Sequence, residues 1–426
     1  MALILKNTQF IDWQTGNVTS GHVKVEPGSE GGLFVANKLD KFGPLGPGDK
    51  TIDCQGKLVT KAFACGHHHI YSTLARGMPA PKKSPTNFEE ILTYVWWHLD
   101  KCLDLEMIEA SALASALYCA KNGVTFVIDH HASPYAIEGS LNTIARAFDK
   151  VGISHLLCYE LSDRDGEGPR EAGLAEHESY LAGGGQGHLG LHASFTVGDD
   201  LLNRSVEMAR RFQTGLHIHV AEDLADQAAC LRDHGKRVVT RLHEAGGLDL
   251  PQTILGHCIH LDDQEKALIR DAGTWVVQNT ESNLNNNVGL ANYNHITDKV
   301  MLGTDGMHCD MLRSAKASFL SGQPVEGTGF DTIYTRFRNV HRYLAECGFQ
   351  GDGDNNLVIL DYDSPTELTS DNFLGHFVYG INSSHVETVI AGGEVIVENR
   401  VATRVDEAEI LAHARQMGNK LWDKMK

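Results

Sequence analysis

Two histidines, His67 and His69, flank a third, His68, at the end of an apolar run. In an extended strand alternate side chains point to opposite faces, so His67 and His69 share one face while His68 points to the other. Two imidazoles on one face at the end of a strand are able to bind the same metal ion. Alone, the H-x-H pattern is equally consistent with histidines that pack in the protein interior.

More imidazoles and carboxylates follow other apolar runs. His219 lies in LHIHV and Glu222 comes three residues later, His257 ends ILGH, and Asp305 follows VMLGT. Every one of these side chains stands at the carboxyl end of a predicted strand. Active sites of barrel enzymes occupy that end, whereas histidines that serve only packing should show no preference for it. The shared position therefore favours one common site.

The elements that must position these residues alternate between helix and strand. Apolar residues recur at helical spacing through residues 103–122, then Asn122-Gly123 supplies a stop and VTFVID indicates a buried strand. Repeats of this pattern place eight candidate parallel strands near residues 62–68, 125–130, 153–159, 189–194, 215–220, 253–257, 274–279 and 299–304. Eight such units favour an α/β fold of the (β/α)8 TIM-barrel type over a doubly wound sheet. A doubly wound sheet would be expected to have a glycine-rich turn after its first strand.

The two flanks of the chain are rich in short alternating strands and turn signals. We therefore expect residues 1–58 and 355–426 to form a small β-sandwich domain from both termini, with residues 59–354 as the barrel. The last segment, EAEILAHARQMGNKLWDKM, is predicted to be an amphipathic helix that packs on the small domain.

Composition limits the class of partner. The 37 Lys and Arg against 55 Asp and Glu give a formal charge of -18, without a basic cluster, which argues against nucleic acid or an anionic membrane as partner. The nine cysteines include no C-x-x-C pair, so neither a disulfide framework nor a cysteine zinc site is expected. The chain starts with a strand pattern and has no apolar run of membrane-spanning length, which predicts a cytoplasmic protein.

Taken together, H-x-H on the first strand, H-x-x-E on the fifth, H on the sixth and T-D-G on the eighth resemble the metal-dependent amidohydrolases, in the deaminase and chlorohydrolase branch. Within it, IDHHASPY, LHASFTV, LHIHVAED, SNLNNNVG, LGTDGMHCDM and the pair Trp96-Trp97 are most similar to the SsnA-type aminohydrolases. The resemblance covers nearly the whole chain.

The resemblance implies that one divalent ion is bound by His67, His69, His219 and Asp305. The fourth strand carries His192 where a binuclear, carbamylated-lysine site would need lysine, so we expect a single ion. Three imidazoles and a carboxylate suit Zn²⁺ and are compatible with Fe²⁺ or Mn²⁺. Barrels of this kind commonly form dimers, so a homodimer or higher homo-oligomer is expected.

Two positions depart from the pattern of these relatives. Lys61-Ala62 stands where they usually have Pro-Gly before the H-x-H, which affects the entry of the strand more than the chemistry. His68 replaces the usual threonine or asparagine, and its outward direction predicts packing or hydrogen bonding instead of metal ligation.

A catalytic scheme follows from the resemblance. A metal-bound water is acidified from a pKa near 15.7 to about 7, which makes hydroxide available as the nucleophile. We expect His257 and Asp305 to orient and deprotonate this water, and Glu222 to carry a proton to a ring nitrogen and then to the leaving group. The alternative for Glu222 is a solvated loop carboxylate.

Relatives place substrate-binding residues where this chain has His192, Asn283 and Arg76. Arg76 is equally consistent with a surface charge, and Asn283 with a turn or cap residue. A further set at the same rim is interpreted as hydrogen-bonding support or direct contact: Asp129, His130, His131 and Glu160. Trp96 and Trp97 are candidates to stack on a heteroaromatic ring, although core packing is the commoner role of such tryptophans.

The resemblance implies hydrolytic deamination of a small nitrogen heterocycle, purine-like or pyrimidine-like. The same site is able to hydrolyse a carbon–halogen bond, a carbon–sulfur bond or a cyclic amide, where only the leaving group differs. The alternative of another class is a non-catalytic scaffold of the same fold, which should lack a ligand position, and here the set is complete.

Overall fold

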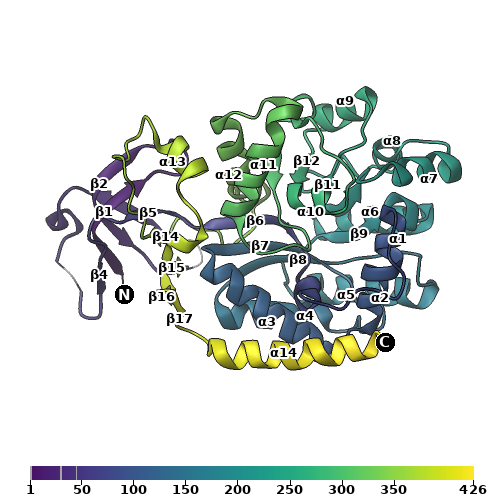
Figure 1. Cartoon of the computed structure of the whole chain (residues 1–426), viewed down its shortest axis with the longest axis horizontal. Coiled ribbons are helices and arrows are strands. Elements are labelled where there is room, and N and C mark those ends of the chain that lie inside the picture. Colours follow the sequence, from purple (N-terminus) through teal and green to yellow (C-terminus); the bar gives the residue numbers. More distant parts are fainter. Residues whose placement is uncertain (1, 29–30, 45) are drawn as a thin grey trace.

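The computed structural model describes residues 2–28, 31–44 and 46–426, and its larger part alternates parallel strands with helices (Figure 1). Eight parallel strands occupy the predicted segments, each within two residues of its expected bounds. They are β6 (Phe63–His68), β7 (Val124–His131), β8 (Ser154–Tyr159), β9 (Leu189–Ala193), β10 (Leu216–Val220), β11 (Ile254–His257), β12 (Trp275–Gln278) and β13 (Val300–Leu302).

These strands form two parallel sheets that meet at both edges. One sheet has the order β6-β7-β8, and the other has the order β13-β12-β11-β10-β9. Single parallel bridges link the first sheet to the second, His68 with Asp305 on one side and Leu157 with Gly187 and Leu161 with Leu191 on the other. The arrangement is that of a TIM-barrel-like α/β fold, with all strand carboxyl ends on one side.

The strand sequences explain their burial. Every residue of β6 and β7 is buried, as expected for parallel strands covered on both faces. Apolar side chains from both sheets pack in one cluster with α12 (Phe330–Cys347). The helix stop at Asn122 is also confirmed: α3 (Leu105–Lys121) ends there and Gly123 takes a left-handed φ of 78°.

Helices follow the strands, and most of them cover the strands from outside (Figure 1). They are α3, α4 (Ser140–Val151), α5 (Glu167–Ala182), α6 (Asp199–Phe212), α7 (Leu224–His234), α8 (Val238–Glu244), α9 (Asp263–Ala272), α10 (Thr280–Asn285), α11 (Met311–Glu326) and α12. A 3-10 turn at Ile70–Ala75 follows β6, and the short helices α1 (Phe88–Ile91) and α2 (Trp97–Leu99) flank a π-helical turn at Leu92–Trp96.

Strands from both ends of the chain pair in a separate nine-stranded sheet. Its order is β17-β16-β15-β14-β5-β1-β2-β3, with β4 also paired to β1. The bounds are β1 (Leu3–Ile11), β2 (Val18–Val25), β3 (Leu33–Ala36), β4 (Lys50–Asp53), β5 (Leu58–Lys61), β14 (Leu357–Leu360), β15 (Val386–Ala391), β16 (Glu394–Glu398) and β17 (Val401–Ala402). The sheet thus extends to Lys61, and its apolar residues gather in a cluster of their own. Between β14 and β15 lies the short helix α13 (Phe373–Tyr379).

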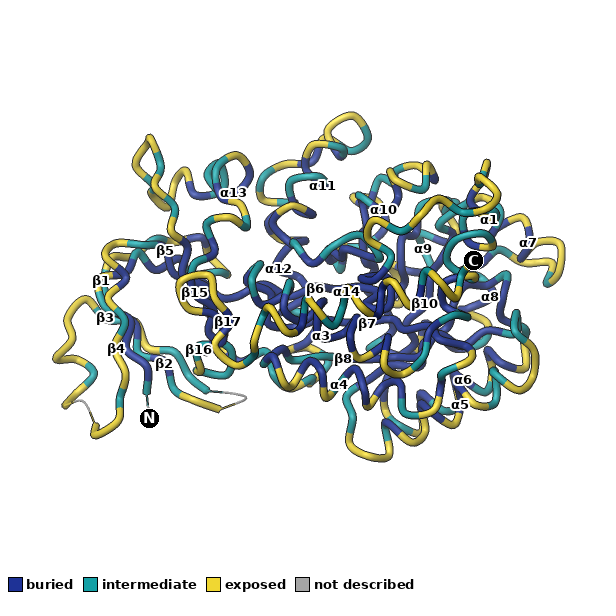
Figure 2. The backbone as a smooth tube through the Cα atoms, turned by 60° about the horizontal axis from the view of Figure 1, so that its bottom comes forward, coloured by how far each residue is buried: buried dark blue, intermediate teal, exposed yellow. Residues whose placement is uncertain are grey.

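The last helix, α14 (Glu407–Lys424), runs away from the terminal sheet and along α3 (Figure 1). The indole Nε1 of Trp422 donates a hydrogen bond of 2.9 Å to the carbonyl of Leu74 in the turn that follows β6. The expectation that this helix packs on the small domain was wrong, because its apolar side covers α3 and that turn. Figure 2 shows that buried residues are concentrated in the strands and that exposed residues lie mainly in loops and along helices. Among the described residues, no helix is both long and apolar enough to cross a membrane.

Candidate metal centre

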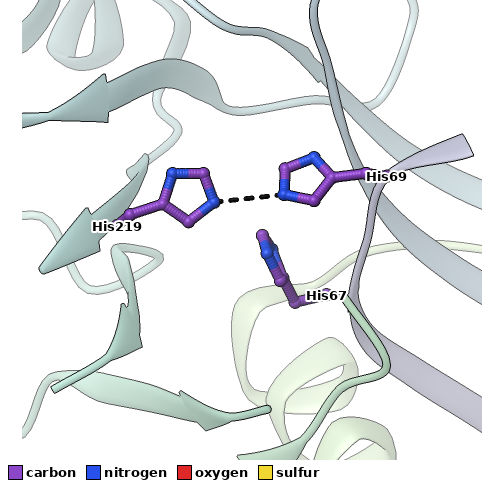
Figure 3. A group of neighbouring side chains, drawn as sticks. All are labelled: His67, His69 and His219. Carbon is purple, nitrogen blue, oxygen red and sulfur yellow. Dashed lines mark hydrogen bonds between the residues drawn. The ribbon is translucent and has the colours of Figure 1, made fainter. Parts of the chain in front are cut away.

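Three imidazoles from two strands point toward one another at the carboxyl ends of the parallel strands. His67 and His69 come from β6 and its end, and His219 comes from β10 (Figure 3). One ring nitrogen from each lies within 4.8 Å of the others, and the Nε2 atoms of His219 and His69 are 3.2 Å apart. All three residues are buried.

The other ring nitrogen of each histidine already has a partner. Nδ1 of His69 lies 2.5 Å from the carbonyl of His130, and Nδ1 of His219 lies 2.8 Å from the carbonyl of His192. Because a carbonyl only accepts, each Nδ1 must carry a proton, so Nε2 is the nitrogen of each ring that is placed to bind a metal. Nδ1 of His67 pairs with Nε2 of His217 at 2.9 Å.

Asp305 completes the group. Its Oδ1 lies 3.1 Å from Nε2 of His69 and 3.8 Å from Nε2 of His67, and it also accepts the Gly306 backbone N–H at 2.7 Å. Burial alone would raise the pKa of this carboxyl, but the surrounding histidines, His69 foremost, hold it well below its usual range. Asp305 is therefore an anion in a buried site.

The chemistry of this donor set fits a divalent cation. Nε2 of His67 is buried and has no hydrogen-bond partner. Burial holds the pKa of His67 and of His219 well below the ordinary value, so both are neutral, as a ligand must be. Burial would lower the pKa of His69 as well, but contact with Asp305 outweighs it and raises that pKa to about 9. A positive charge is thus favoured between His69 and Asp305, where a metal ion would supply it.

His257 and Glu222 lie beside this group. Nε2 of His257 is 3.4 Å from Oε2 of Glu222 and 3.6 Å from Oδ2 of Asp305, and it has no hydrogen-bond partner. Nδ1 of His257 lies 2.7 Å from Oδ1 of Asn283, and Asn286 donates to Oε1 of Glu222 at 3.2 Å. Burial raises the pKa of Glu222. Acceptor atoms on His257, Glu222 and Asp305 therefore converge where a water would donate.

Left-handed backbone occurs at three strand ends beside the site. Ala221, His257 and Asp305 have φ of 47°, 65° and 52°. Non-glycine residues in this region are uncommon and cluster at functional sites. These three lie beside the site, whereas other non-glycine residues with positive φ, such as Asn7 and Gln213, lie elsewhere.

A cavity opens onto His69, His219 and Asp305. Its walls combine aromatic and polar side chains. They are His69, Tyr71, Ser72, Phe88, Leu92, Trp96, Trp97, Glu160, Arg164, His192, His219, Glu222, Ser282, Asn285, Asn286, Asp305, Gly306 and Met307. The predicted residues His192, Glu160, Trp96 and Trp97 are among them.

Two predicted substrate contacts lie elsewhere. Asn283 is buried and contacts His257, so it positions that imidazole instead of lining the cavity. Arg76 is outside the cavity: its guanidinium stacks on the ring of Tyr118 at 4.9 Å, beside α14. The chain turns away from the site after His69 through the 3-10 turn, which explains why Arg76 faces another side of the molecule.

Other residues at the rim hydrogen-bond to the segments around the ligands. Asp129 accepts the backbone N–H of Ile70 at 2.8 Å, and His131 contacts the hydroxyl of Ser133 at 2.9 Å. Nε2 of His130 lies 3.1 Å from the carbonyl of Leu191. Hydrogen bonding behind the ligands was one of the two roles predicted for this set.

The two unusual positions have structural partners. Nδ1 of His68 lies 2.9 Å from the carbonyl of Asp305, and its Nε2 lies 3.0 Å from the Ser115 hydroxyl, so it points away from the metal group. The Lys61 ammonium is buried, donates to the carbonyls of Asp352 and Gly353, and lies 3.5 Å from the Asp352 carboxylate.

Sequence reasoning did not single out Arg164 or Asn286. Arg164 follows Glu160 by four residues in the loop after β8, and Asn286 lies in the asparagine run after β12. Their polar type and loop position after a strand were the available signals.

The chain belongs to the amidohydrolase family, whose model matches residues 58–333. It is a hydrolase that acts on carbon–nitrogen bonds, and the family is metal-dependent.

Curated relatives match over nearly the whole length. A protein of Syntrophomonas wolfei named 5-methylthioadenosine/S-adenosylhomocysteine deaminase is 26% identical over 451 residues, which cover 99% of each chain. A 5'-deoxyadenosine deaminase of Methanopyrus kandleri is 28% identical over 403 residues, or 88% of each. The fold is similar to the crystal structure of an adenosine deaminase from Xanthomonas campestris with bound zinc, at a TM-score of 0.85, 18% identity and 98% coverage of both chains.

Proposed function

We propose that the protein is a metal-dependent aminohydrolase that releases ammonia from a purine-like or pyrimidine-like heterocycle. The observation that carries this proposal is the convergence of three imidazoles and Asp305 next to the pair His257 and Glu222, beside a cavity with aromatic sides. The deaminase names of the relatives support the same reaction.

His67, His69, His219 and Asp305 would hold one divalent ion. Nitrogen and oxygen donors in this number suit Zn²⁺, as in the zinc-bound neighbour structure, and also accept Fe²⁺ or Mn²⁺. When bound, such an ion acidifies a water molecule and supplies hydroxide near neutral pH.

The chain's own residues account for the protons. His257, held by Asn283, and Asp305 orient the attacking water through the acceptor atoms that face each other. Glu222 takes a proton from that water and delivers it to the ring nitrogen next to the reacting carbon. A second proton, from the added hydroxyl, then passes through Glu222 to the amino group, which leaves as ammonia while the ring keeps the oxygen as a carbonyl.

His192 is proposed as a substrate contact. It lines the cavity, and its Nδ1 lies 2.7 Å from the Thr196 hydroxyl. Burial lowers the pKa of His192 to about 4, so it is a neutral group that donates or accepts a hydrogen bond. Trp96 and Trp97 supply faces on which a flat ring can stack.

We also propose a division into a closed (β/α)8 barrel over residues 59–354 and a small β-sandwich domain over 1–58 and 355–426. The bridges at both seams of the parallel sheets support closure. The separate apolar cluster of the terminal sheet supports a second unit, although α14 returns to the barrel.

Ammonia release tests the function. Enzyme of measured metal content is incubated with purine nucleosides, free purines, pterins and hydantoins, and ammonia is quantified. We expect release from at least one amino heterocycle, abolished by a chelator and restored by Zn²⁺. Conversion of halogenated or cyclic-amide substrates without ammonia release would instead support the same site acting on another bond. No binding of metal even after reconstitution would support a non-catalytic scaffold.

A further inference from the structure

The cavity contains one arginine, Arg164, on the loop after β8. Among the residues that the structure describes, it is the only Lys or Arg in the cavity wall, and its guanidinium lies 5.1 Å from the ring centre of Trp97. An arginine in a substrate cavity commonly receives a carboxylate or phosphate through two parallel hydrogen bonds. The contacts of Arg164 determine whether its guanidinium is free to bind a substrate anion in this way.

Carboxylates of the protein occupy the edges of this guanidinium. Nε lies 2.9 Å from Oδ2 of Asp165, Nη2 contacts Oδ2 of Asp100, and Nη1 lies 3.4 Å from Oε1 of Glu160. Asp165 is shared with Lys101, whose Nζ lies 2.8 Å from Oδ1. The side chains of Arg164, Asp100, Asp165 and Glu160 are exposed by only 10%, 1%, 5% and 4%, so these contacts are shielded from water.

No edge of the Arg164 guanidinium therefore has two free N–H groups with which to bind both oxygens of a substrate anion. One flat face covers Trp97, and each nitrogen has an acidic partner. Arg164 fixes the carboxylates around it and, together with Lys101, offsets part of their charge.

Glu160 is the member of this group that reaches the cavity from the side nearest the histidines. Its Oε2 lies 3.4 Å from Nδ1 of His130, and its Oε1 faces Arg164. Burial alone would raise the pKa of Glu160, but His192, His130 and Arg164 hold it well below the usual range. An ionised carboxylate only accepts hydrogen bonds, and each oxygen accepts more than one.

The charge of the cavity wall also disfavours an anionic substrate. Glu160, Glu222 and Asp305 line it, while its one guanidinium is already paired with Glu160, Asp100 and Asp165. A divalent ion would be balanced by Asp305 and Glu222. An added anion would then face Glu160 in a buried space, without a cation of its own.

We propose that Glu160, held by Arg164, determines specificity: it accepts a hydrogen bond from a donor group of the substrate and excludes heterocycles that carry a carboxylate or phosphate. This inference rests on the proposed function, because it names the class of substrate for the same site. The substrate is an uncharged amino heterocycle with an N–H or O–H donor beyond the reacting ring atoms.

Binding of a matched pair of ligands tests the proposal. Inosine-5'-carboxamide and inosine-5'-carboxylate have nearly equal size, differ in charge and lack the amino group, so deamination does not consume them. Dissociation constants are measured by titration calorimetry with the zinc-loaded enzyme. We expect the carboxamide to bind at least about tenfold more tightly, since a buried like-charge contact costs more than about 1.4 kcal/mol, the equivalent of tenfold.

Substitutions assign the preference to named residues. Glu160→Gln keeps the shape and removes the charge, and Asp165→Asn releases one edge of Arg164. In both variants the preference for the carboxamide should shrink toward equality. Glu171→Gln is the matched control, because Glu171 also pairs with an arginine, Arg204, but at the surface and outside the cavity wall.

The outcomes separate this proposal from the proposed function. Equal or tighter binding of the carboxylate by the wild-type enzyme, binding of neither ligand, or an unchanged preference in a folded, zinc-loaded Glu160→Gln variant would each overturn the role of Glu160. Carboxamide preference without ammonia release from any heterocycle would support Glu160 as the selective group and refute deamination. Melting temperature and zinc content confirm that each variant is folded.

Discussion

At the scale of single residues, the metal centre depends on the nitrogen that faces away from it. Each of the three ligand imidazoles has a partner at Nδ1, and these partners determine which nitrogen keeps a lone pair. His217 is the one partner that is a side chain. It is buried, and burial holds its pKa well below the ordinary value, so it is a neutral acceptor for His67.

Replacing His217 with phenylalanine should weaken metal binding by about 10–100-fold, the usual effect of losing a group that orients a ligand. Competition with a chromophoric chelator measures this. His177→Phe is the control: His177 is also a buried histidine and contacts the Tyr159 backbone N–H at 3.1 Å, away from the metal group. Equal metal affinity of the His217 variant and wild type would show that the contact has no orienting role.

Glu222→Gln should lower kcat by about 10²–10⁴-fold, because the amide cannot carry the proton to the leaving group. Metal content should stay full, since Glu222 lies next to His257 instead of among the four proposed ligands. Steady-state kinetics on a substrate found in the ammonia screen, with metal analysis of the same preparation, provides the comparison. Retention of most of kcat at full metal occupancy would contradict the proton-transfer role.

Asp226 predicts a pH dependence of stability. It accepts backbone N–H groups of Ala221 and Phe195 at 2.8 and 3.2 Å, yet burial raises its pKa to about 7 from the ordinary value of 3.8. A group with a raised pKa stabilises the fold fully below about 3.8, and that contribution is lost as pH rises through 7. Relative to Asp226→Asn, wild type should therefore lose up to about 1.4 kcal/mol of unfolding free energy per pH unit between pH 5 and 7. Urea unfolding at several pH values would show a constant difference if this pKa were wrong.

Residues at strand ends could be predicted from sequence, because strand alternation and the carboxyl-end rule give both face and direction. His67, His69, His219, His257 and Asp305 follow from those two rules and lie together in the structure. Loop residues have no such rule. Arg76 was therefore expected in the cavity and lies outside it, while Arg164 and Asn286 were not singled out although they face it.

At the scale of elements, the helix-to-strand repeat predicted all eight parallel strands, because fully buried strands leave continuous apolar runs. Packing partners were harder to predict. The amphipathic pattern of α14 indicates that one side is covered, but it does not say by which surface, and the helix covers α3 instead of the terminal sheet.

The entry to β6 also depends on tertiary contacts. Lys61 ends β5, where relatives were expected to have proline, and its ammonium is buried against Asp352. Arg338 donates to the carbonyls of Lys61 and Ala62 at 3.1 Å, so hydrogen bonds from a charged side chain fix the backbone where the relatives were expected to have a proline.

Lys61→Met should lower the free energy of unfolding by about 3 kcal/mol, because Asp352 would keep its charge in a buried place with one cation fewer. Denaturant unfolding measures the change. Lys57→Met removes an ion pair with Glu387 at 2.6 Å that is partly exposed, and it should cost less than about 1 kcal/mol. A similar small loss in both variants would show that the Lys61 contact contributes little.

At the scale of the whole molecule, a bound ion should stabilise the fold. The four proposed ligands come from β6, from β10 and from the end of β13, so one ion would connect both parallel sheets. An ion that binds only the folded chain adds about 4.1 kcal/mol when free metal is about 1,000 times its Kd.

Removal of metal by a chelator should therefore lower the melting temperature, and Zn²⁺ should restore it in proportion to the logarithm of its concentration. Scanning calorimetry of apo and reconstituted protein measures both effects. The variant His219→Ala, which removes the one ligand from β10, serves as the control and should show little response to Zn²⁺. An identical melting temperature with and without metal would contradict binding at this site.

The terminal sheet can be completed only late in the synthesis of the chain. β5 lies between β1 and β14, and its residues Leu58 and Val59 are buried. On a ribosome, β1 and β5 emerge early, but residues 62–356 must be synthesised before β14 is available to pair. One edge of β5 therefore stays open while the barrel strands form, and an open apolar edge is a site of aggregation. Nascent chains stalled before residue 357 should bind general chaperones more than chains that include β14.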